Sequence, residues 1–138
     1  ASHNKGSAPA AVDCYPATRY DSGGWQTPGM WFQVELPEAT TVTALQLDST
    51  SSPEDFPRGY KVELSMDAKS WSQPIATGKG DLPVTILSFA PTKTKFIRIT
   101  QTGTAANRYW SIHELALYQP GKTLLLTKAA KKVTPSYE

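Results

Sequence analysis

Cysteine and histidine are scarce in this sequence, which has one cysteine, Cys14, and two histidines, His3 and His113. A single cysteine excludes an intramolecular disulfide, so the fold must be stable without one. The sequence has no zinc-binding pattern of histidines and cysteines, and no glycine-rich loop of the kind that cradles phosphates. No apolar run approaches the roughly 20 residues that span a bilayer. Disulfide-rich scaffolds and membrane-spanning helices are therefore excluded.

Positive charge is also scarce, except near the end of the chain. The formal net charge is +2, but residues 121–138 carry four lysines against one glutamate, so the first 120 residues together carry a charge of −1. Proteins that bind nucleic acids usually present a basic stripe that neutralises phosphates. We therefore expect no nucleic-acid binding by the folded part of the chain.

One group of residues invites a catalytic interpretation, because Ser111, His113 and Glu114 lie close together in the sequence. On a strand, Ser111 and His113 share one face while Glu114 points to the other. Three residues so close on one strand cannot form the relay of nucleophile, base and orienting acid that acyl transfer needs. We therefore expect no enzymatic activity.

The pattern that is present is one of short strands and turns in a single domain. The segments 31–36 and 60–65 alternate apolar and polar residues, and Pro37 is expected to end the first of them. Further short segments rich in β-forming residues lie at 41–47, 84–89, 95–100 and 112–118. Alternation of this kind, broken by clusters of Pro, Gly, Ser and Asp, predicts an antiparallel β-sandwich. Trp31 and Trp71 are expected to belong to its core.

The last residues differ from the rest in composition. Residues 1–119 are predicted to form the β-sandwich domain, and residues 120–138 a basic C-terminal tail or linker. The tail contains Leu124–Leu126 and several lysines, so a short helix that docks on a partner is the alternative. We favour the linker, because basic chain ends are usually mobile.

Five pieces of the sequence, in one order, resemble a known family. They are Ala11-Val-Asp-Cys14 with Thr18-Arg-Tyr20, Pro28 to Leu36, Tyr60 to Asp67 with Trp71, Lys95-Phe-Ile-Arg-Ile99, and Trp110-Ser-Ile-His-Glu-Leu115. In this order they resemble the factor V/VIII type C, or discoidin, family, which includes the family 32 carbohydrate-binding modules. The resemblance covers residues 1 to about 119. It implies an all-β fold, an eight-stranded antiparallel jelly-roll β-sandwich of the galactose-binding-like type.

The resemblance also implies a structural calcium ion (Ca2+) that joins the two ends of the domain. The positions that match the family's ligands are Ala10, Asp13, Tyr15, Thr18, His113 and Glu114. Carboxylates, carbonyls and a hydroxyl suit a hard cation that takes about 6 to 8 oxygen ligands. One departure is Cys14, where the family usually has glycine. The alternative is that Asp13 caps a turn through hydrogen bonds to the backbone, with no metal.

In the family, ligands bind to loops at one end of the sandwich, which here correspond to residues 21–26, 49–58 and 103–110. Sugar recognition needs an aromatic face and planar polar groups. The aromatic candidates are Trp25, Phe56, Tyr109 and Trp110, and the polar candidates are Asp55, Arg58, Asn107 and Arg108. Three of these residues have alternative interpretations. Arg58 suits a structural ion pair, Trp110 suits the core, and Trp25 could cover the edge of the core.

The predicted function is that of a non-catalytic carbohydrate-binding module, a targeting or adhesion part of a larger protein that is secreted, extracellular or periplasmic. Its predicted partner is a glycan, with galactose-type sugars as one candidate. A protein- or surface-interaction module and a phospholipid-binding domain are the alternatives. Membrane binding is disfavoured, because the loop tips are rich in Ser, Thr, Asp and Ala rather than in apolar residues flanked by basic ones.

Overall fold

The computed structural model describes residues 4–13, 15, 17–121, 125–126 and 132–135. Its elements, in chain order, are η1 (Asn4–Val12), β1 (Tyr20–Gln26), β2 (Met30–Asp48), β3 (Tyr60–Ser65), β4 (Ala76–Gly78), β5 (Val84–Gln101), β6 (Ala105–Ile112), β7 (Glu114–Tyr118), β8 (Leu125–Leu126) and β9 (Lys132–Pro135). Apart from the short 3-10 helix η1, these elements are strands, which confirms the all-β fold class. The family resemblance also implies that Ala1 and Ser2 end the family's first strand, and these two residues lie outside the described residues.

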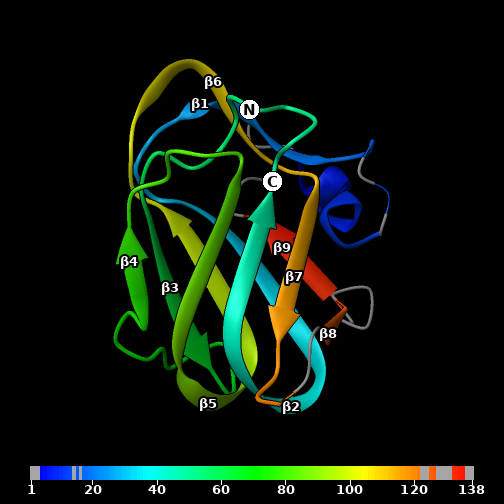
Figure 1. Ribbon diagram of the computed structural model, residues 1–138, viewed down its shortest axis with the longest axis vertical. Helices are drawn as coiled ribbons and strands as arrows, with labels where there is room; N and C mark the ends of the chain where they lie inside the picture. Colours follow the sequence, from blue (N-terminus) through cyan, green and yellow to red (C-terminus); the bar gives the residue numbers. More distant parts are fainter. Residues whose placement is uncertain (1–3, 14, 16, 122–124, 127–131, 136–138) are drawn as a thin grey trace.

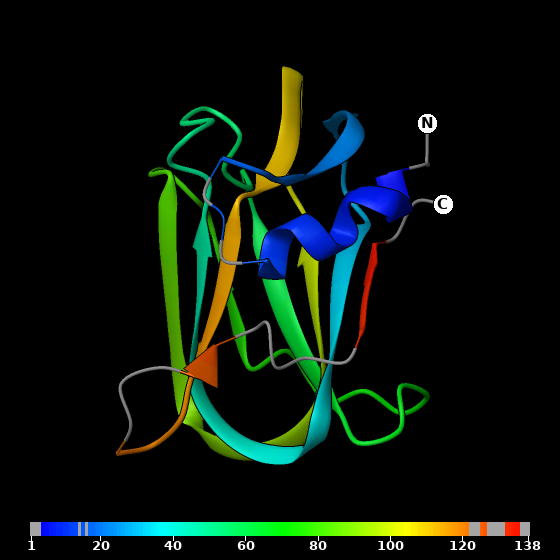
Figure 2. The same ribbon diagram turned by 90° about the vertical axis from the view of Figure 1, so that its right-hand side faces the viewer.

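The strands form two antiparallel sheets. A two-stranded sheet pairs β1 with β6, and the larger sheet has the order β4-β3-β5-β2-β7-β8, with β9 also paired to β2. Figures 1 and 2 show that β2 and β5 both curve round at one end of the molecule, so that the large sheet folds over into two layers. The loops that precede β3 and the β1–β6 ribbon lie at the other end (Figure 1).

The long bent strand β2 corrects one expectation, namely that Pro37 ends a strand. The two strands expected at 31–36 and 41–47 belong to one strand, whose pairing with β5 is irregular between Glu35 and Thr40. Pro37 falls in this irregular stretch. Because proline has no N–H to donate to the ladder, it interrupts the pairing while the chain continues round the bend.

The core lies between the two layers and is built from the inward-facing half of each alternating strand. Along the first part of β2, the even-numbered residues from Met30 to Leu36 are buried and the residues between them are partly exposed. The opposite layer contributes residues such as Leu45 and Leu117, both fully buried. Tyr20, Phe32 and Trp110 pack as an aromatic group, with Tyr20 4.9 Å from Phe32 and 6.2 Å from Trp110 between ring centroids.

The expectation that Trp31 and Trp71 belong to this core is wrong. Both lie on the outer face of the sheet, where the guanidinium of Arg98 is 4.2 Å from the Trp31 ring and 4.3 Å from the Trp71 ring. The same guanidinium donates hydrogen bonds from Nε and Nη2 to Oε1 of Gln33. Trp31 alternates with the buried Phe32, so it must point away from the core. The contact stabilises the turn before Trp71 against the sheet.

Two described segments of the tail extend the large sheet. Leu125–Leu126 pairs with β7, and Lys132–Pro135 pairs with the first part of β2, with Phe32 opposite Pro135. These segments are therefore strands, neither a docking helix nor a free linker. The other tail residues from 122 onward lie outside the described residues. The domain boundary near residue 119 stays a prediction.

Candidate functional site

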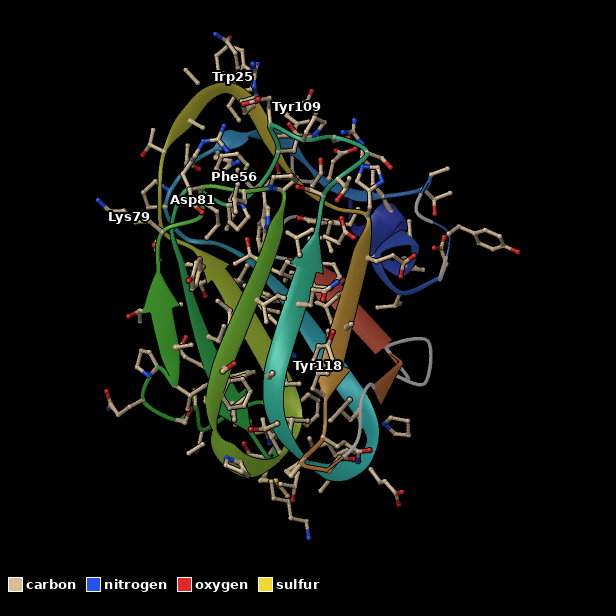
Figure 3. The ribbon with its side chains drawn as sticks, in the orientation of Figure 1. Trp25, Phe56, Lys79, Asp81, Tyr109 and Tyr118 are labelled. Carbon is tan, nitrogen blue, oxygen red and sulfur yellow. The ribbon has the colours of Figure 1, made fainter. Side chains whose placement is uncertain are left out.

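A pocket of ≈ 420 Å³ lies at the loop end of the sandwich. It is lined by residues from β1, the loop between β2 and β3, and β6: Arg19, Trp25, Ser52, Pro53, Glu54, Asp55, Asn107, Arg108 and Tyr109. In Figure 3, Trp25 and Tyr109 stand at the tip of the molecule, with Phe56 below them on the same end. The pocket therefore lies where the sequence placed the recognition loops.

The rim of the pocket carries two exposed aromatic side chains. Trp25 is 56% exposed and Tyr109 is 37% exposed, and the two residues are opposite each other in the β1–β6 pairing. The pairing is irregular on both sides of Trp25. Gly23 and Asn107 have φ angles of 66° and 64°, a region that glycine and asparagine adopt most readily. These local turns bend the ribbon and leave both rings at its surface.

The floor of the pocket is held together by Arg19. Its Nη1 atom donates to Oγ of Ser52 at 3.0 Å, to Oδ2 of Asp55 at 3.0 Å and to Oγ of Ser111 at 3.1 Å. Ser111 also donates to Oδ2 of Asp55, at 2.6 Å. Within the described part of the chain, Nη2 of Arg19 and Oδ1 of Asp55 have no hydrogen-bond partner. The floor therefore offers a donor and an acceptor side by side.

Gln26, which sequence reasoning did not select, ties the loops of the site together from below. Its side chain is 1% exposed. Nε2 donates to the carbonyls of Phe56 at 2.9 Å and Tyr109 at 3.1 Å, while Oε1 accepts from the backbone N–H of Arg58 at 3.0 Å. One buried amide thus fixes the loop before β3 against β6. Gln26 could have been found as a polar residue at an inward-facing position of a strand, because a buried polar side chain almost always has hydrogen-bond partners.

Five of the eight predicted sugar-binding residues line the pocket: Trp25, Asp55, Asn107, Arg108 and Tyr109. Phe56 and Arg58 lie beside it, with the Arg58 guanidinium 3.9 Å from the centre of the Phe56 ring. Arg58 donates to the carbonyls of Phe56 and Glu54. It therefore stabilises its own loop through main-chain oxygens.

Trp110 as a ligand-contacting residue is a prediction that the structure contradicts. Its side chain is 0% exposed and packs against Tyr20 in the core. The register explains the difference, since Tyr109 and Trp110 are neighbours on β6 and point to opposite faces. Tyr109 is therefore the one of the two that faces the pocket.

Four pocket residues were not predicted: Arg19, Ser52, Pro53 and Glu54. Three of them lie in the loop 49–58, which was predicted as a ligand-binding loop, although these three residues were not predicted to contact a ligand. Arg19 had a weaker signal. It stands between a predicted metal ligand and the first buried residue of β1, and nothing local indicates that its side chain reaches Ser111, 92 positions along the chain.

The loop of the predicted calcium ligands forms a compact turn around Asp13. The carboxylate accepts hydrogen bonds from the N–H of Tyr15 at 2.8 Å and from Oγ1 of Thr18 at 2.5 Å. The Thr18 hydroxyl is also 2.9 Å from the carbonyl oxygen of Tyr15. The side chain of Asp13 also interacts with that of Glu114. Asp13 and Glu114, which are far apart in the sequence, therefore lie close together in the fold.

The charge state of Asp13 follows from these contacts. Burial raises the pKa of Asp13, but the hydrogen bonds from Thr18 and Tyr15 and the interaction with Glu114 outweigh burial, so the pKa lies below its ordinary value. The turn alone would produce hydrogen bonds of this kind, as the alternative to calcium supposes. Cys14, where a positive φ was in question, lies outside the described residues.

The remaining predicted calcium ligands lie on either side of this turn. Ala10 is on η1, and Glu114 begins β7 beside Asp48 of β2. The His113 side chain is buried and places Nε2 2.8 Å from Oγ of Ser52, in the wall of the pocket. Among the described residues, no group of three or more His, Cys, Asp and Glu side chains could hold a metal. A cation here would depend on two carboxylates together with main-chain and hydroxyl oxygens.

Comparison with known proteins identifies the family of this chain. The family described as "F5/8 type C domain" matches residues 1–115. No curated protein matches the chain at a significant level. No helix among the described residues is long and apolar enough to cross a membrane.

Several solved structures share the fold at low sequence identity. Chitosan-binding module 2 of a chitosanase/glucanase from Paenibacillus sp. IK-5, in complex with chitotriose, has 24% identity and a TM-score of 0.70, with 84% of this chain and 88% of that chain covered. The family 32 module of NanJ from C. perfringens, in complex with galactose, has 22% identity, a TM-score of 0.69 and coverage of 81% and 84%. A third, CBM32-3 from a family 31 glycoside hydrolase of Clostridium perfringens, has 21% identity, a TM-score of 0.69 and coverage of 81% of both chains. The match over residues 1–115 shows that the chain belongs to the F5/8 type C domain family.

Proposed function

We propose that this chain is a non-catalytic carbohydrate-binding module, which recognises a glycan in the pocket at the loop end of the sandwich. The observation that carries the proposal is the arrangement of Trp25 and Tyr109 above Arg19 and Asp55. An exposed aromatic ring covers the C–H face of a sugar, and a guanidinium beside a carboxylate suits neighbouring hydroxyls. The sugar complexes of the NanJ module and of the chitosan-binding module support the same class of ligand.

Glycan binding is tested with the full chain on a glycan array, followed by calorimetry with galactose and chitotriose. We expect Trp25→Ala and Arg108→Ala each to weaken binding by about tenfold or more, the loss expected when a central contact residue is truncated. Leu82→Ala is the control, since Leu82 is 62% exposed and lies outside the pocket. Absence of binding to every glycan, or equal losses from Leu82→Ala and Trp25→Ala, would reject the proposal.

We also propose that the Asp13 loop holds a structural calcium ion. Its ligands would be the carboxylates of Asp13 and Glu114, the hydroxyl of Thr18 and main-chain oxygens of Ala10, Tyr15, Thr18 and His113. The contact between the Asp13 and Glu114 side chains supports this donor set, because it brings two carboxyl groups from distant parts of the chain to one place. A bound calcium ion would neutralise both and join the start of the chain to β7.

The setting that suits such a module is a larger protein that is secreted, extracellular or periplasmic, in which it would provide targeting or adhesion. The two alternatives predict different results in the same experiments. A protein-interaction module would capture a specific protein and bind no glycan. A phospholipid-binding domain would co-sediment with liposomes, but the pocket offers anionic lipids no net positive charge, because Glu54 and Asp55 balance Arg19 and Arg108.

A further inference from the structure

The candidate calcium loop and the candidate glycan pocket are adjacent at two points of the chain. Thr18, whose hydroxyl contacts Asp13, is followed directly by Arg19, which lines the pocket. Glu114, which interacts with Asp13, is preceded directly by His113, whose ring contacts Ser52 of the pocket wall. A conformational change in the Asp13 loop can therefore reach the pocket along the chain in two ways, through Thr18 to Arg19 and through Glu114 to His113.

Of these two routes, the one through Arg19 reaches more of the pocket. Its Nη1 atom contacts Ser52, Asp55 and Ser111, which come from the loop before β3 and from β6. The backbone N–H of Ser111 also donates to the carbonyl of Asp55, at 3.1 Å. Two of the elements that line the pocket, the loop before β3 and strand β6, thus meet at the Arg19 guanidinium. The residue before Arg19, Thr18, belongs to the Asp13 loop.

The His113 route is buried and rigid. The His113 side chain is buried, its backbone N–H donates to the carbonyl of Asp48 at 2.8 Å, and Nε2 contacts Ser52. Ser52 is therefore held by His113 on one side and by Arg19 on the other. His113 lies in the bend between β6 and β7, where its N–H is bound to Asp48 of β2, so Arg19, which directly follows the Asp13 loop, is the side that responds to the conformation of that loop.

We propose that Arg19 is a positioning residue that couples divalent-cation binding in the Asp13 loop to the shape of the glycan pocket. The inference rests on the proposed calcium and glycan sites. The turn 13–18 is held by the hydrogen bond between Thr18 and Asp13. A cation coordinated by these oxygens and by Glu114 would replace that bond with several metal–oxygen bonds, which would stiffen the turn and hold Arg19 more firmly against Ser52, Asp55 and Ser111. Such coupling is reciprocal, so each ligand raises the affinity for the other by the same factor.

The test uses Ca2+ alone as the probe and the full chain, so it does not require the glycan to be known. Calorimetry measures the Ca2+ affinity, and NMR follows the indole N–H resonance of Trp25 on the rim. In the wild type, we expect this resonance to shift with the same midpoint as Ca2+ binding. In Arg19→Lys, which keeps the charge but loses the planar fork, we expect Ca2+ to bind within about threefold of the wild-type affinity while the Trp25 shift is lost.

Arg58→Lys is the matched control, because among the described residues the Arg58 guanidinium donates only to main-chain oxygens of its own loop and packs on the Phe56 ring, so the Trp25 shift should persist. Thermal unfolding checks that each variant is folded. If Arg19→Lys does not fold, Ser111→Ala removes one Arg19 contact and should reduce the shift. The inference is overturned if the Trp25 resonance still shifts in Arg19→Lys, or shifts as far as in the wild type in Ser111→Ala where that variant replaces it. It is also overturned if Ca2+ binds the wild type and the Trp25 resonance does not shift.

A second arm separates this inference from the proposed function. With galactose or chitotriose, whichever binds the wild type, Ca2+ should raise the sugar affinity by about fivefold or more, and Arg19→Lys should abolish that factor. If neither sugar binds but the Trp25 shift depends on Arg19, glycan binding fails and the coupling holds. If glycan binds and Ca2+ does not bind at all, the coupling is refuted and the glycan proposal stands.

Discussion

Replacing Gln26 by leucine should destabilise the protein substantially, although leucine is apolar and similar in size. The wild-type amide makes three hydrogen bonds, to the carbonyls of Phe56 and Tyr109 and from the N–H of Arg58. Leucine would leave the carbonyl of Tyr109 and the N–H of Arg58 without that partner at a site where the side chain is 1% exposed, while the carbonyl of Phe56 keeps its hydrogen bond from the Arg58 guanidinium. Each unsatisfied buried group costs about 1–3 kcal/mol, so we expect a loss of about 3 kcal/mol after partial relaxation.

The assay for Gln26→Leu is urea unfolding together with a thermal melt. A loss of about 3 kcal/mol corresponds to a fall in Tm of roughly 10 °C for a domain of this size. Gln73→Leu is the control, since Gln73 is exposed and should leave Tm nearly unchanged. Because two of the lost hydrogen bonds hold Phe56 and Tyr109, affinity at the pocket should fall as well. A Tm within about 2 °C of the wild type would refute the view that Gln26 holds the loops together.

Three further predictions concern other parts of the molecule. Arg98→Met should lower the free energy of unfolding by about 1–2 kcal/mol, because it removes the cation from between Trp31 and Trp71. Urea unfolding measures the loss, with Lys61→Met as the control variant. Calcium at about 100 times its Kd should raise the free energy of unfolding of the wild type by about 2.7 kcal/mol, and Asp13→Asn should remove that increase. An equal increase in the wild type and in Asp13→Asn, measured by urea unfolding, would contradict the metal site. The N–H groups of Ser70 and Lys69 and the hydroxyl of Ser65 lower the pKa of Asp67. The ionised carboxylate of Asp67 therefore stabilises the fold at a pH above its ordinary pKa of about 3.9, and this stabilisation is lost as the pH falls through the lowered pKa. The difference in free energy of unfolding between the wild type and Asp67→Ala should narrow in acid, and a difference that widens would contradict this.

The parts of the fold that could be predicted from the sequence are those with a local cause. Alternation at 31–36 and 60–65 identifies the inward faces of two strands, and both segments are strands in the structure. The same alternation, applied to Trp31, indicates the outer face, whereas residue type alone had suggested the core. Bends were harder to predict. Pro37 reads as the end of a strand, because nothing near it shows that the chain continues into the other layer.

The candidate site divides in the same way. The loops were predicted as segments, through the family resemblance. The choice of residues within them depends on register, which sends Tyr109 to the surface and the neighbouring Trp110 to the core. Register is set by pairing with β1, a strand interrupted by glycines that the alternation pattern did not identify.

The sequence by itself determined the all-β class and the inward faces of the main strands, which follow from interactions between neighbours in the chain, such as side-chain alternation and the turn preferences of glycine and proline. The three loops at one end of the molecule were indicated by the resemblance to a known family. Only the tertiary structure decided that Arg19 meets Asp55, 36 positions away, and Ser111, 92 positions away. Contacts of this kind depend on how the two layers pack and where each strand is in register. No local pattern of residues encodes that geometry, and the shape of the pocket depends on it.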